Sequence, residues 1–181
     1  MRCTVTGNWW QNDKMDNRIG NVALAMMQKN CGDTRRIEHS LKVFAYAQLL
    51  GIAESLNDKM MEILVLSALL HDIGIHIAEK KYGKATSRDQ ESEGPPVAHE
   101  ILTKMNFEPE VIERVCYIIS RHHTFSAVDN IDFQLLVEAD FLVNSVEDHL
   151  SDIQVSNFAK NIFKSESGLS YLMLLFPDIA L

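Results

Sequence analysis

The stretch LLHDIGIHI, residues 69–77, constrains the fold most, because it sets a histidine and an aspartate side by side after the most apolar run in the chain. The preceding residues, ILVLSALL (63–70), carry no charge, so we expect a helix buried in the core. An aspartate buried without partners costs several kcal/mol. The rest of the chain must therefore supply groups that hold Asp72.

Helical periodicity explains most of the chain, and no strand pattern competes with it. The expected helices span residues 16–29, 35–50, 58–75, 96–106, 110–123, 131–148, 152–164 and 168–176. Asp33 or Thr34 can cap the second helix, and Gly51 can end it. Pro96 and Pro109 suit the first turns of their helices. We therefore predict an all-α fold, a single-domain helical bundle.

Composition restricts the class of protein. The chain has 181 residues, 46% of them hydrophobic, which suits one soluble domain. Its net charge of -8 argues against binding to a nucleic-acid duplex or an anionic membrane. No signal-peptide core and no long apolar span are evident, so we expect a cytoplasmic protein. The three cysteines suggest neither a disulfide framework nor a cysteine zinc site, and we expect reduced thiols.

Two segments are harder to interpret. Residues 1–14 fit no helix well, and Trp9 and Trp10 could pack on the domain or mark a homodimer contact. Residues 79–94 are expected to form one long polar connection, and such loops are often functional. The basic residues of this segment are candidate phosphate contacts, although a solvated surface loop is an equal alternative. They are Lys80, Lys81, Lys84 and Arg88.

Several histidines fall on apolar helix faces. His39 is in line with Val43, and His99 shares a face with Leu102. A single histidine in such a place is more often a hydrogen-bonded core residue than a ligand. The adjacent pair His122 and His123 is harder to dismiss, because periodicity turns one or both rings inward.

Asp140 lies in an apolar stripe of its helix, so a second carboxylate is aimed at the core. Carboxylates are rarely buried unless they are paired or bound to a cation. The alternative to a metal is a salt bridge, to Arg36 or Arg121.

Inward histidines and aspartates from distant points of the chain together indicate a metal site, because helical bundles build such sites from facing helices. Nitrogen and oxygen ligands without thiolates favour Fe, Mn, Co, Ni, Zn or Mg over a structural zinc tetrahedron. The candidate ligands exceed what one open catalytic metal can use. Two metals with Asp72 between them therefore explain the number of ligands more simply. The candidates are His39, His71, Asp72, His99, His122 and Asp140.

This pattern resembles the HD-domain superfamily of metal-dependent phosphohydrolases, in its small stand-alone members. The likeness covers about residues 33–148 in the expected order and includes the segments ALLHDIG, AHEIL and IISRHH. It implies an HD-type bundle over 15–181, with the helices at about 152–176 following the motifs. It also implies that Asp72 is shared by two metals, the first held by His39, His71 and Asp140.

The resemblance assigns further roles. His99 and His122 would complete the second metal, with His123 a neighbour or substrate contact, and Arg36 matches an arginine frequent in the family. Many relatives carry a lysine where this chain has Ile75, so His76 or a lysine of residues 79–94 could replace it. Glu138 and Asn144 are candidates to orient ligands. Glu147 could do the same, but an ordinary surface position is the more expected one.

The function implied is hydrolysis of a phosphate ester or anhydride in a small substrate, most simply a nucleotide, by metal-activated water. In this scheme His71, Asp72 and Arg36 carry the catalysis. A di-iron oxygenase of the HD type and a non-catalytic nucleotide sensor are the alternatives. Oxygen consumption or absence of turnover would distinguish them.

Overall fold

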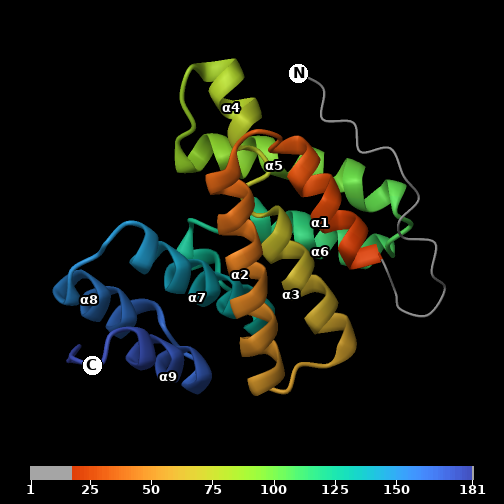
Figure 1. Ribbon diagram of the computed structural model, residues 1–181. Coiled ribbons are helices and arrows are strands. Elements are labelled where there is room, and N and C mark those ends of the chain that lie inside the picture. The colour runs from red at the N-terminus through yellow and green to blue at the C-terminus, as the bar shows by residue number, and fades with distance from the viewer. Residues whose placement is uncertain (1–17, 181) are drawn as a thin grey trace.

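The computed structural model describes residues 18–180 as a bundle of α-helices, with no strand in that range. Figure 1 shows their arrangement. The helices are α1 (Arg18–Lys29), α2 (Thr34–Ala53), α3 (Asp58–Leu70), α4 (Ile75–Tyr82), α5 (Ser87–Lys104), α6 (Pro109–Ile119), α7 (Ile131–Glu147), α8 (Asp152–Ile162) and α9 (Glu166–Leu175), with a 3-10 turn η1 (Phe125–Ala127). The predicted all-α fold is confirmed. The expectations for residues 1–14, including Trp9 and Trp10, lie outside the described residues.

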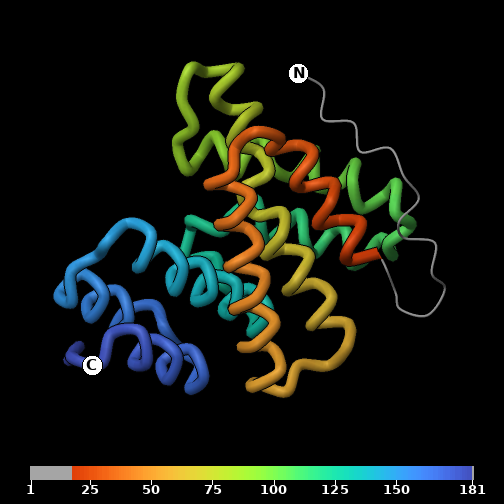
Figure 2. The backbone as a smooth tube through the Cα atoms, in the orientation of Figure 1, coloured from red at the N-terminus to blue at the C-terminus, as the bar shows by residue number. Residues whose placement is uncertain are grey.

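Helix α3 is the centre of the core, packed against α1, α2, α6 and α7. All residues from Ile63 to Leu70 are buried, as the apolar run predicts. The stretch Asp58–Tyr82 is apolar and long enough to cross a membrane, but 67% of its most apolar window is buried inside the fold. It therefore has the character of a core helix. Helices α8 and α9 lie together at the lower left of the view, and α4 projects at the top (Figure 2).

The predicted loop at 79–94 is wrong, because only residues 83–86 lie between α4 and α5. Thr86 starts α5 with a capping box, in which its side chain accepts from the backbone of Asp89 and the Asp89 carboxylate accepts from the backbone of Thr86. Pro95 and Pro96 consequently fall inside α5, not in its first turn. The prolines were the misleading signal, since a helix interior normally excludes them.

Several other helix ends differ from, or agree with, those predicted from the sequence. Asp33 caps α2 through its side chain and Pro109 begins α6, as predicted, but α2 continues past Gly51 to Ala53. The predicted helix 58–75 is broken by a turn at residues 71–74, and α6 ends at Ile119. Both histidine motifs therefore lie in turns directly after a helix. One cysteine expectation also fails: Cys116 is a free thiol, but Cys31 is disulfide-bonded.

Two backbone segments touch where the turn at 71–74 meets α5. A Cβ atom added to Gly74 would lie 2.5 Å from the backbone nitrogen of Gly94. A Cβ atom on Gly94 would meet nothing closer than 3.8 Å. Only glycine at position 74 permits this approach, which fixes α5 beside the His71–Asp72 pair.

We expect Gly74→Ala to lower the free energy of unfolding by about 1–3 kcal/mol, because backbone atoms must separate to admit the methyl group. Gly94→Ala is the matched control and should be neutral or stabilising by up to about 1 kcal/mol, since alanine favours a helix interior. Urea unfolding of both variants measures the difference. Equal stability of the two would contradict this account of the contact.

Candidate metal centre

Five of the predicted ligands converge. His39 comes from α2 and Asp140 from α7, and His71 lies in the turn after α3. The His39 Nε2 atom is 3.2 Å from the His71 Nε2 atom and 3.2 Å from the Asp140 Oδ1 atom. The His71 Nε2 atom is 3.5 Å from the same Asp140 oxygen. These three side chains could hold one metal ion.

Asp72 lies between this group and His122. Its Oδ2 atom is 3.5 Å from the His71 Nε2 atom and 3.8 Å from the His39 Nε2 atom. Its Oδ1 atom is 3.6 Å from the His122 Nε2 atom. Asp72, His122 and His123 form a second group that could hold a metal. One carboxylate thus presents an oxygen to each group.

Hydrogen bonds on the far side of each ring fix which nitrogen faces the cluster. The His71 Nδ1–H group donates to the Ala68 carbonyl at 2.9 Å, and the His122 Nδ1–H group donates to the Ile119 carbonyl at 2.7 Å. The His39 Nδ1 atom lies 3.1 Å from a carboxylate oxygen of Glu147 and donates to it. In neutral rings, all three Nε2 atoms therefore turn a lone pair inward.

This donor set fits a metal cation. The Nε2 atom of His122 is buried and has no hydrogen-bond partner among the described residues, which is costly for a polar atom unless something binds it. The Nε2 atoms of His39 and His71 face each other at 3.2 Å, so a cation or a proton is favoured between them. Neutral imidazoles and carboxylates are the ligands of Zn, Fe, Mn, Co and Ni.

The electrostatics favour positive charge at the same point. Burial works against a charged His71 ring, but Asp72 and Asp140 outweigh it and raise the pKa to about 9. Burial likewise opposes charge on His39, yet Asp140 and Asp72 raise its pKa. The pKa values of Asp72 and Asp140 lie well below their usual range, because the surrounding imidazoles overcome the burial that would raise them. Both carboxylates are ionised at neutral pH.

No arginine among residues 18–180 holds Asp140. Its partners are His39, His71 and the amide of Asn144, which donates to its Oδ1 atom at 2.9 Å. Asn144 thus lies where the sequence suggested. Arg121 donates instead to the Ser120 hydroxyl at 2.7 Å. The salt-bridge alternative for Asp140 fails.

Glu147 belongs to the site, contrary to the surface position expected for it. Its Oε1 atom accepts from Lys42 at 2.9 Å, and its Oε2 atom accepts from His39. Its place in α7, seven residues after Asp140, is the signal that could have found it, because that spacing returns to the same helix face.

His99 is not at the cluster, which contradicts its expected role as a ligand. Its side chain is exposed and lines a separate pocket with Thr103 and Glu113. The buried face of α5 consists of Gly94, Val97, Ala98, Ile101 and Leu102. Helix α5 buries that stripe against α6, and His99 lies on the other face.

Glu138 also differs from expectation, because it does not orient a metal ligand. It is fully buried, but it accepts hydrogen bonds from Gln134 and from the backbone of Lys164 and Ser165. It therefore joins α7 to the start of α9, away from the metal ligands.

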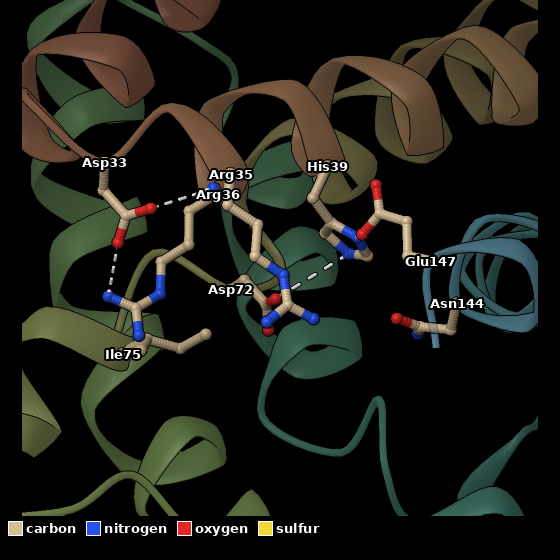
Figure 3. Close-up of a pocket in the computed structure, with 8 residues that line it drawn as sticks. All are labelled: Asp33, Arg35, Arg36, His39, Asp72, Ile75, Asn144 and Glu147. Carbon is tan, nitrogen blue, oxygen red and sulfur yellow. Dashed lines mark hydrogen bonds and ion pairs between the residues drawn. The ribbon is translucent and has the colours of Figure 1, made fainter. Parts of the chain in front are cut away.

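A pocket of about 240 Å³ opens beside the cluster (Figure 3). Its lining residues are Asp33, Arg35, Arg36, His39, Asp72, Ile75, Asn144 and Glu147. Arg36 is held rigidly, donating to Asp33 at 2.8 Å and to Glu79 at 2.6 Å. The Arg35 side chain is 77% exposed and lies 3.3 Å from the Asp148 carboxylate. The sequence argument missed Arg35, although the RR pair is visible in the sequence.

The basic residues expected to contact phosphate do not line this pocket. Lys80, Lys81, Lys84 and Arg88 are exposed, and Lys81 pairs with Glu93. His76 does not line the pocket either, but it contacts Arg36 and Asp33, which do, and Glu79. Ile75 lines the pocket without providing a charge.

His123 is next to the cluster, and its ring centroid is 3.9 Å from that of His122. Burial and, to a lesser extent, the neighbouring His122 lower the pKa of His123 to about 4. The ring is therefore neutral at ordinary pH and retains one lone pair.

The HD domain family model matches residues 36–154, which is well over half of the chain. The chain belongs to the HD-domain family. Its fold is similar to the crystal structure of a predicted HD superfamily hydrolase from an uncultured Thermotogales bacterium, with a TM-score of 0.62 and 20% identity. That match covers 89% of this chain and 84% of the other. No curated protein is significantly similar in sequence.

Membership of this family implies a divalent metal, and the donor set described above fits one. His39, His71, Asp72 and Asp140 are the residues of this HD domain that would hold it. As a bound Lewis acid, such a metal activates water and neutralises charge on a reacting group.

We expect His122→Ala to lose the metal that Asp72, His122 and His123 could hold and His99→Ala to retain it, because of these two histidines only His122 turns a nitrogen toward Asp72. Elemental analysis of both variants after identical metal loading measures this. Loss of metal from His99→Ala, with His122→Ala unchanged, would contradict the geometry.

Metal affinity should rise with pH. The raised pKa values of His39 and His71 mean that protons occupy these rings in the metal-free protein until a metal displaces them. We expect Zn²⁺ affinity to increase between about pH 6 and pH 9, with proton release on binding. Calorimetry in buffers of different ionisation enthalpy counts the protons. An affinity independent of pH would contradict proton competition.

Proposed function

We propose that this HD-domain protein is a metal-dependent phosphohydrolase that cleaves a phosphate ester or anhydride of a small substrate, most simply a nucleotide. The observation that carries the proposal is the set of inward imidazole nitrogens and carboxylates beside a pocket that also presents two arginines. Metal ligands supply a site for activating water, and arginines suit the binding of phosphate oxygens. The two features together fit phosphoryl transfer to water.

The chain's own residues perform the positioning. Glu147 holds the His39 ring through its Nδ1 atom, and Asn144 holds the Asp140 carboxylate. Such outer contacts orient ligands and determine which nitrogen is available. Because the carbonyls of Ala68 and Ile119 hold two further rings, the cluster is arranged before anything binds.

The arginines have different proposed roles. Arg36 is fixed by Asp33 and Glu79, so it offers a fixed positive edge at the pocket mouth. Arg35 is the exposed cation that can turn toward an anionic substrate. In this proposal the two arginines take the place of the lysines that the sequence argument considered.

We further propose two metal positions that share Asp72. The support is that its Oδ2 atom faces His39 and His71 while its Oδ1 atom faces His122. A pair of metals sharing a carboxylate is a common arrangement for hydrolysis of phosphate esters.

Asp72→Asn tests the proposal, because it keeps the shape of the side chain and removes the charge. We expect loss of bound metal and a fall in turnover of more than about 100-fold, since loss of a side chain that merely orients a metal ligand already costs roughly 10- to 100-fold. The helical fold should remain. Asp178→Asn, on the exposed surface, is the control and should retain metal and turnover.

The assay is a screen of nucleotides and phosphate esters with Mn, Fe, Co, Ni, Zn and Mg, in the presence and absence of oxygen. Release of phosphate or nucleoside that needs metal but not oxygen supports the hydrolase. Oxygen consumption would favour the oxygenase alternative, and nucleotide binding without turnover would favour a sensor. Asp72→Asn that stays metallated and active would contradict the proposal.

A further inference from the structure

Gln90 on α5 determines how the His123 ring is held. The amide nitrogen of Gln90 donates to the Ala85 carbonyl at 3.4 Å, which turns its Oε1 atom toward His123. The His123 Nε2 atom lies 2.9 Å from that oxygen. Because an amide oxygen only accepts, the Nε2 atom must carry the proton of this hydrogen bond.

The consequence concerns the other nitrogen. In a neutral imidazole one nitrogen is protonated and the other keeps its lone pair. One ring nitrogen of His123 lies within 4.8 Å of a carboxylate oxygen of Asp72 and of a ring nitrogen of His122, and all three atoms could coordinate a metal. With the Nε2 atom committed to Gln90, the Nδ1 atom is the nitrogen of His123 that remains able to coordinate.

The His122 ring is held through its other nitrogen. Its Nδ1–H group donates to the Ile119 carbonyl, and its Nε2 atom is buried without a partner among the described residues. The two adjacent rings therefore reach the same region through different nitrogens. This explains how two neighbours in sequence can both serve one site.

The backbone of this turn is also held by α5. The Glu91 Oε1 atom accepts from the His123 backbone N–H at 3.0 Å and from the Thr124 hydroxyl at 3.0 Å. Glu91 therefore fixes the position of the turn, whereas Gln90 fixes the ring. Neither role was evident from the sequence, which placed both residues in a loop.

We propose that Gln90 is a positioning residue that holds His123 with its Nε2 atom protonated, so that the Nδ1 atom binds a second divalent transition metal together with Asp72 and His122. The inference rests on the proposed function for its two metal positions. It replaces His99, which lies elsewhere, with His123. The pair Gln90–His123 thus becomes part of the metal-binding machinery.

The first test is nitrogen NMR of the imidazoles in the metal-free, ¹⁵N-labelled protein, with His123 assigned by its absence in His123→Ala. We expect the His123 ring to show a protonated Nε2 atom and an unprotonated Nδ1 atom. A ring protonated at the Nδ1 atom would overturn the proposal. This readout needs no variant of Gln90 and no activity.

The second test compares Gln90→Met, which has no strong acceptor, with Gln90→Glu, which keeps one. Calorimetric titration with Zn²⁺ should show the second equivalent weakened by about 10- to 100-fold in Gln90→Met, with the first unchanged. Gln90→Glu should retain the wild-type tautomer and most of the second affinity. Equal second affinities in wild type and Gln90→Met would overturn the role of Gln90.

These readouts separate the two proposals. Absence of phosphohydrolase activity in a protein that binds two Zn²⁺ ions with the expected tautomer would count against the function alone. Hydrolysis by a wild-type protein that never binds more than one Zn²⁺ ion would count against the second metal position alone.

Discussion

The site depends on imidazole lone pairs that face each other inside the bundle. His39 and His71 approach through their Nε2 atoms at 3.2 Å, and each ring is held from behind by an acceptor at its Nδ1 atom. Lone pairs so arranged repel each other unless a cation or proton lies between them. Two ionised carboxylates on the same side make a cation favourable, which is why an apolar helix can end at Asp72.

The helical scaffold serves this arrangement. The second part of helix α3, Ile63–Leu70, is buried on all sides and so delivers His71 and Asp72 to the interior. Arg114 in the middle of α6 pairs with Asp129 just before α7 and with Asp132 in the first turn of α7, which ties these two helices together. The contact of Gly74 with Gly94 sets α5 beside the centre. The polar centre is therefore held by ordinary packing around it.

Periodicity and residue type were enough to predict the all-α fold and to single out His39, His71, Asp72, His122 and Asp140 as a group. They failed for His99, because the buried stripe of α5 runs through Val97, Ala98, Ile101 and Leu102 and leaves His99 on the exposed side. With α5 begun at residue 96, neither Gln90 nor Glu91 could be related to His123. Glu147 was undervalued because a charged residue near a helix end is usually solvated. In each case long-range packing, which a single sequence does not report, made the difference.

The most direct test of the metal account is the free energy of unfolding of chelator-treated protein as a function of free Zn²⁺ or Mn²⁺ concentration. A metal bound only by the folded cluster should raise stability, by about 2.7 kcal/mol at a concentration 100 times its Kd. The same titration of Asp72→Asn should be flat. A flat titration of the wild-type protein would contradict the claim that a metal holds this cluster.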